Sequence, residues 1–100
     1  MVATIQKLED KYVATLKGEL NTAAAVEVEE ILKPLYKSDG RDVIIDCTEL
    51  EYIASSGLRI LISILKRAKT NGSKVILKNL NDDIKNVFKL TGFINLFEFV

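Results

Sequence analysis

Two adjacent hydroxyl side chains precede a glycine near the middle of the chain, in residues 54–59 (ASSGLR). Helical spacing begins directly after this glycine, so Ser55 and Ser56 are expected at a helix start. The first turn of a helix leaves backbone N–H groups unpaired and carries a partial positive charge. A phosphate ester on either serine would be favoured there. The plainer interpretation of the same residues is that one serine caps the helix.

Most other catalytic chemistry lacks the residues that it requires. The chain has no histidine and 1 cysteine, which excludes a Ser-His-Asp triad and a zinc site built from His or several Cys ligands. Its 5 glycines form neither a Walker loop nor a G-x-G-x-x-G turn. Asp82 and Asp83 follow Asn81, where acidic residues complement a helix N-terminus, and Cys47 is expected to be an inert residue facing the core. We therefore expect no catalytic residue, no metal ligand and no cofactor.

The elements that would position the serines can be read along the chain. Residues 2–7 and 12–16 alternate in polarity around a polar turn, which predicts two short antiparallel strands. Asn21 and Thr22 are both suitable N-caps for the helix that follows. Pro34 predicts that this helix ends just before it. Apolar residues recur along the helix with a helical period, at Ala24, Val28, Ile31, Leu32 and Leu35.

The second half of the chain alternates strands with helices. Residues 43–45 are a β-branched run typical of a strand buried on both faces, as in a parallel sheet, and the apolar residues 75–77 predict another buried strand. Residues 48–54 are expected to form a loop that leads to the two serines. Helix start and stop signals predict two further helices, one over 58–70 closed by Asn71-Gly72 and one over 82–91 between Asn81 and Gly92. Residues 97–100 are expected to form a final strand.

The element order is therefore ββαβαβαβ, which predicts an α/β fold. We expect a central mixed sheet of four to five strands with helices packed against it through right-handed crossovers. The 100 residues suffice for a single domain over 1–100, and 48% hydrophobic with 28% charged residues is a globular composition.

The charge balance and the N-terminal sequence bear on partners and compartment. Lys and Arg number 14 and Asp and Glu number 14, so the net charge is zero and direct nucleic-acid binding is not expected. The first ten residues lack the pattern of a signal peptide, and no apolar run is long enough for membrane insertion. We expect a cytoplasmic protein.

The middle of the chain combines a strand with the sequence Val-Ile-Ile-Asp, an apolar-aromatic loop, and Ser-Ser-Gly-Leu-Arg at a helix start. In this combination the chain resembles the STAS domain family, the anti-sigma factor antagonists and their relatives. Residues 18–22 (GELNT) are similar to the family's Gly-x-Leu-Asp turn before its first helix. The inferred element order also matches, so the resemblance covers essentially the whole chain and implies the STAS fold. Asn21 and Ala54 stand where the family commonly has aspartate.

The resemblance implies partner switching by a bacterial regulatory protein rather than an enzymatic activity. In the family, the unphosphorylated domain binds an anti-sigma factor, which frees the sigma factor. The anti-sigma factor is often a serine kinase that then phosphorylates the second hydroxyl residue before the glycine, here Ser56, with Ser55 as a minor candidate; a phosphatase is a further implied partner. The resemblance places the partner-binding surface at Asn21, Thr22, Ala54, Ser55, Gly57, Leu58 and Arg59.

Two other functions remain as alternatives. A STAS adaptor subunit, in an ABC lipid transporter or a stressosome-type scaffold, would use the same surface without phosphorylation, and the neutral Asn21 and Ala54 favour it. A nucleotide-binding domain ranks last, because no phosphate-cradling loop is present.

Overall fold

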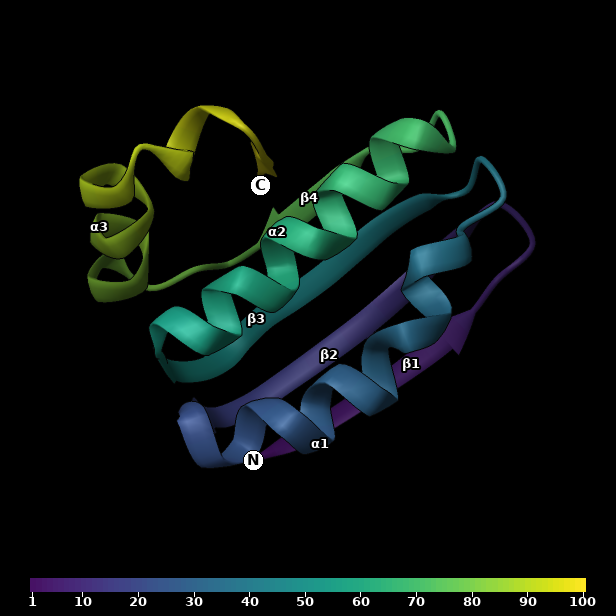
Figure 1. Cartoon of the computed structure of the whole chain (residues 1–100). Coiled ribbons are helices and arrows are strands. Elements are labelled where there is room, and N and C mark those ends of the chain that lie inside the picture. Colours follow the sequence, from purple (N-terminus) through teal and green to yellow (C-terminus); the bar gives the residue numbers. More distant parts are fainter.

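One mixed sheet runs through the whole protein, in the strand order β1-β2-β3-β4-β5. The computed structural model describes all residues 1–100 (Figure 1). The elements are β1 (Val2–Lys7), β2 (Lys11–Leu20), α1 (Thr22–Leu32), the 3-10 helix η1 (Lys33–Lys37), β3 (Asp42–Ile53), α2 (Ser55–Thr70), β4 (Val75–Lys78), α3 (Asp82–Thr91), the 3-10 helix η2 (Phe93–Asn95) and β5 (Glu98–Phe99).

The pairing of the strands follows the order of the chain. β1 and β2 form the predicted antiparallel hairpin, with Gln6 opposite Val13. The pairs β2–β3, β3–β4 and β4–β5 are parallel. The predicted α/β fold, with a mixed sheet and the order ββαβαβαβ, is therefore confirmed.

The helices cover one face of this sheet. Each crossover from β2 onward steps in the same direction across the sheet, and right-handed crossovers that never reverse direction place every helix on the same side. Figure 1 shows α1 and α2 side by side on that face. The expectation that residues 43–45 are buried on both faces is wrong, because Val43 and Ile45 are fully buried whereas Ile44 is only half-buried on the face without helices.

The core lies between the sheet and the helices as one cluster of 24 buried residues. The buried face of α1 is formed by Ala25, Val28 and Leu32. Of the predicted stripe, Val28, Leu32 and Leu35 are buried, the last of them in η1, whereas Ala24 and Ile31 are only half-buried. Pro34 occupies the first turn of η1, and α1 ends at Leu32 as predicted.

Two strands are longer than expected, and their extra length positions the functional residues. β2 continues past residue 16 through Gly18, whose φ of +96° suits glycine, and reaches Leu20. β3 continues to Ile53, so most of the expected loop over 48–54 is strand. As a result Leu20 and Ile53 are paired across the sheet, each at the end of its strand.

Candidate functional site

Two helices start next to each other at the paired strand ends. Asn21 and Ala54 follow Leu20 and Ile53 directly and are the N-cap residues of α1 and α2. The backbone N–H of Ala54 donates a hydrogen bond of 2.8 Å to the carbonyl of Leu20. The first turns of α1 and α2 are therefore held side by side by the sheet itself.

The two helix starts differ in how they are capped. The Asn21 side chain accepts a hydrogen bond of 2.9 Å from the backbone N–H of Ala24, so the predicted cap of α1 is confirmed. The N-cap of α2 is Ala54, which offers no side-chain acceptor, and Ser55 is already inside the helix. The interpretation that one serine caps this helix is therefore wrong, and the start of α2 has no side-chain cap.

Ser56 is the serine that faces the neighbouring helix. It is half-buried, whereas Ser55 is exposed. Its Oγ donates a long hydrogen bond of 3.4 Å to Oγ1 of Thr22 in the first turn of α1. A hydroxyl held by one long hydrogen bond remains available for reaction or for another contact.

Gly57 and Leu58 belong to the core rather than to the surface. Leu58 is 5% exposed. A Cβ on Gly57 would lie 2.6 Å from Cγ of Leu20 and 3.1 Å from Cγ1 of Ile53, which is closer than packed carbon atoms approach. These two predicted partner-binding residues thus offer no exposed side chain, and they fix the start of α2 against the strand ends.

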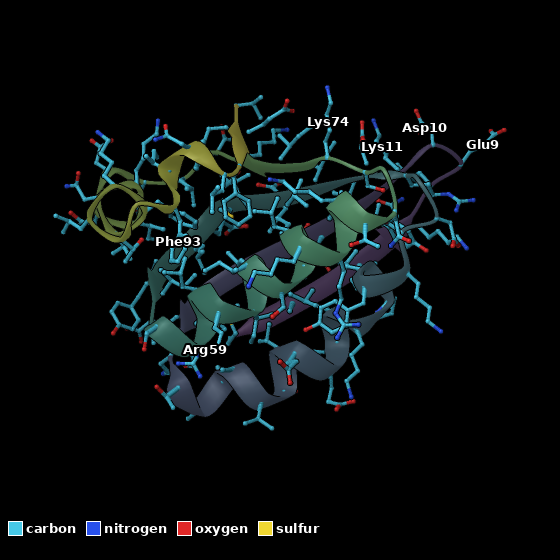
Figure 2. All side chains as sticks on the ribbon, turned by 45° about the horizontal axis from the view of Figure 1, so that its top comes forward. Glu9, Asp10, Lys11, Arg59, Lys74 and Phe93 are labelled. Atoms are coloured by element: carbon cyan, nitrogen blue, oxygen red, sulfur yellow. The ribbon has the colours of Figure 1, made fainter.

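Ser56 opens onto a groove of about 190 Å³ between α1 and α2. The groove is lined by Ala25, Val26, Glu29, Ser56, Arg59, Ile60 and Ser63. Figure 2 shows Arg59 near the start of α2 on the side that faces α1, at the opposite end of the molecule from Glu9, Asp10 and Lys11. The predicted Arg59 is thus brought next to Ser56 in one concave surface.

The contribution of α1 to this groove was not predicted from the sequence. Val26 is 75% exposed although it is aliphatic. Glu29 lies on the same helix and lines the groove with it. The available signal was that Val26 falls off the apolar stripe of its helix, on a face that is otherwise polar.

Three further observations concern acidic and metal-ligating clusters, the single cysteine and the helices. No group of three or more His, Cys, Asp or Glu side chains is placed to hold a metal ion. Cys47 is buried, and burial together with the nearby Asp46 charge raises the pKa of its thiol to about 12. None of the helices combines the length and apolar character needed to cross a bilayer.

Comparisons of the sequence with known proteins give a consistent family. Residues 3–100 match the STAS domain. BtrV of Bordetella bronchiseptica, which is assigned as an anti-sigma factor antagonist, is 30% identical over 97 residues, covering 97% of this chain and 84% of BtrV. The anti-sigma-B factor antagonist of Staphylococcus aureus is 29% identical over 89 residues, and the match covers 88% of this chain and 82% of the Staphylococcus protein.

A comparison of structures shows the same fold. The anti-sigma factor antagonist SpoIIAA in its unphosphorylated form superposes with a TM-score of 0.81 at 18% identity, covering 99% of this chain and 88% of SpoIIAA. The phosphorylated form of SpoIIAA, described as a Bacillus cell fate determinant, gives a TM-score of 0.75 at 16% identity, with coverage of 99% and 91%.

Proposed function

The chain belongs to the STAS domain family, beside anti-sigma factor antagonists, and from this premise we propose that it is a phosphorylation-controlled partner switch. In this proposal the unphosphorylated protein binds an anti-sigma factor through the surface around the start of α2, which frees a sigma factor. Phosphorylation of Ser56 by the anti-sigma factor, acting as a serine kinase, ends the complex. A phosphatase restores the binding form, and the exchange takes place in the bacterial cytoplasm, where sigma factors act.

One observation carries the proposal: Ser56 lies at an uncapped helix start, beside the start of a second helix. Unpaired N–H groups and the helix dipole stabilise a phosphate at such a position. The exposed Ser55 lies one residue closer to the N-cap but does not line the groove. The position of Ser56 therefore supports it as the acceptor over its neighbour.

The chemical step requires little of this protein beyond presenting the hydroxyl. Oγ of Ser56 attacks the γ-phosphorus of a nucleoside triphosphate, and a new P–O bond forms as the bond from that phosphorus to the β,γ-bridging oxygen breaks. The nucleoside diphosphate leaves, and the hydroxyl proton is released to a base. The kinase supplies that base and the metal ion. The protein acts here as a substrate and binding partner, and its contribution is the accessible, weakly held hydroxyl.

Release of the partner follows from the charge added to the groove. A phosphoserine carries roughly −1.5 to −2 charges at neutral pH and is larger than a hydroxyl. Because Ser56 lines the groove, a partner packed there would meet both the added volume and the added charge. The start of α2 itself stays in place, because the neighbouring Gly57 and Leu58 are packed in the core.

The test uses the purified protein with its cognate anti-sigma factor kinase and Mg·ATP. We expect intact-mass spectrometry to show one added phosphate on the wild-type protein and on Ser55→Ala, and none on Ser56→Ala. Equal phosphorylation of Ser56→Ala would contradict the assignment. A protein that binds a partner stably and is never phosphorylated would instead act as a constitutive adaptor of the kind described above.

A further inference from the structure

Arg59 is a cation without a counterpart in its own chain. It is exposed, it lines the groove beside Ser56, and it takes part in no salt bridge, hydrogen bond or cation–π contact. By contrast, the guanidinium of Arg67 on the same helix lies 4.2 Å from the ring centroid of Tyr36. α2 contains no acidic residue that could pair with either arginine. The charge of Arg59 is therefore available to an external group.

The spacing of Arg59 from Ser56 would also bring a phosphate on Ser56 within reach of the guanidinium. Residues three apart on a helix have Cβ atoms about 5–6 Å apart on the same side. Ser56 and Arg59 are so related, and both line the same groove. A phosphate on Ser56 would offer three acceptor oxygens to a guanidinium whose planar donors can bind two of them at once.

We propose, building on the proposed function, that Arg59 has two mutually exclusive partners. While Ser56 is unmodified, Arg59 binds a carboxylate side chain of the anti-sigma factor in the groove. Once Ser56 is phosphorylated, Arg59 pairs with the phosphate and is withdrawn from that carboxylate. Phosphorylation thus removes an attractive contact from the interface in addition to adding a repulsive one.

The charges around the groove favour a single carboxylate over a polyanion as the external partner. Besides Arg59, the charged residue that lines the groove is Glu29 on α1. Glu27 and Glu30 are also exposed on that helix. A nucleic acid backbone lying along the groove would meet these carboxylates, whereas one Asp or Glu side chain can reach Arg59 from the α2 side.

The first test examines the phosphate–Arg59 pair without any partner or kinase. Phosphoserine is incorporated at position 56 by genetic encoding, and its second ionisation is followed by ³¹P NMR. Because a neighbouring cation favours the dianion, Arg59→Gln should raise the second pKa of the phosphoserine by about 0.5 pH unit or more. Lys66→Gln, which removes one positive charge about 15 Å along α2 from position 56, should leave the second pKa unchanged. Equal values in the wild-type and Arg59→Gln proteins would overturn the proposal.

The second test measures affinity for the anti-sigma factor in a double-mutant cycle of phosphoserine at 56 and Arg59→Gln. We expect Arg59→Gln to weaken the unmodified complex about tenfold, and phosphoserine to weaken the variant complex by a smaller factor than it weakens the wild type. Strictly additive effects would overturn the shared role of Arg59 and leave the proposed function standing. A phosphoserine that does not weaken the wild-type complex would overturn the proposed function, and the NMR titration would still decide whether Arg59 pairs with the phosphate.

Discussion

Gly57 lies so close to Leu20 that a Cβ in its place would be 2.6 Å from the Leu20 Cγ atom. Leu20 is fully buried at the end of β2, and Gly57 is in the first turn of α2. This contact sets the distance between the helix start and the sheet, and with it the position of the adjacent Ser56. The glycine of the serine motif is thus required by packing within the domain.

We predict that Gly57→Ala lowers the free energy of unfolding by about 1–3 kcal/mol, as overpacking of a closed core does. The gain in helix propensity from glycine to alanine, about 0.5–1 kcal/mol, opposes part of that loss. Urea unfolding measures the difference, with the exposed Lys66→Ala of the same helix as a control that should stay within about 0.5 kcal/mol of wild type. A Gly57→Ala protein as stable as wild type would mean that Leu20 moves aside freely.

The missing cap of α2 leads to a stabilising substitution. An aspartate at the N-cap position accepts a hydrogen bond from the second or third residue of the helix. Ala54→Asp should therefore raise the free energy of unfolding by about 1 kcal/mol. Ala54→Asn, which caps without charge, should give most of the same gain in urea titrations, and no gain in either variant would contradict the backbone geometry described for this helix start.

A negative charge at position 56 should be tolerated by the fold. The helix start attracts it, and Asn21 and Ala54 leave the two N-cap positions uncharged. We predict that Ser56→Asp lowers stability by less than about 1 kcal/mol out of the 5–15 kcal/mol typical of a domain.

Restoring acids at both N-caps, with Asn21→Asp and Ala54→Asp, should make Ser56→Asp more costly. Each carboxylate about 6 Å away repels the new charge by roughly 0.7 kcal/mol at a water-like dielectric. Urea titrations at low salt of the wild type, Ser56→Asp, the pair of N-cap substitutions and all three together form a double-mutant cycle. Zero coupling would show that the N-cap side chains do not face position 56.

Arg59 should matter for binding and little for folding. Arg59→Glu reverses the charge beside Ser56 and is expected to weaken anti-sigma factor binding by about 1–3 kcal/mol. Lys66→Glu makes the same charge change on the same helix, away from the groove, and should leave the affinity nearly unchanged. Calorimetry compares the two, and equal affinities for Arg59→Glu and Lys66→Glu would place the interface elsewhere.

The buried Cys47 predicts a loss of stability at alkaline pH. Burial raises the pKa of its thiol from 9.0 to about 12, so the unfolded chain loses this proton first as the pH rises. The contribution of the buried thiol to the free energy of unfolding is fully present below pH 9 and is lost progressively toward pH 12. Between pH 9 and pH 10 the loss is about 1 kcal/mol. The stability difference between wild type and Cys47→Ala should narrow by that amount in urea titrations at the two pH values. A difference that stays constant would show that the thiol ionises freely in the folded protein.

The sequence predicts the helices and the order of elements along the chain better than it predicts burial. Helix ends before Pro34 and at Gly92 follow from local backbone chemistry, and in the structure α1 ends at Leu32 and Gly92 is the left-handed C-cap of α3. Ile44 is different, because its burial depends on which side of the sheet the helices occupy. That side is set by the direction in which successive crossovers step, and no local pattern encodes it.

The end of β3 and the groove show why part of the site could not be predicted. Leu50 and Ile53 are buried three residues apart, because the pairing with β2 shifts register between Gly18 and Glu19 and breaks the alternation expected of a strand. Val26 and Arg59 line one groove although 33 residues separate them, since two helices must first be placed side by side. The position of Ser56 at a helix start needed only local spacing, and it was predicted correctly.

All three α-helices follow the carboxyl ends of parallel strands, so their positive N-terminal ends lie at the same edge of the sheet. Each contributes about half an elementary charge at its start, which makes one rim of the sheet positive in a chain whose side chains sum to zero. At α3 the carboxylates of Asp82 and Asp83 offset this charge, whereas the first turns of α1 and α2 carry no acid. The uncompensated part of the field is therefore confined to the two helix starts around Ser56. A charged partner approaching through solution exerts a torque on such a molecule and turns this rim, rather than a random side, toward its own negative groups.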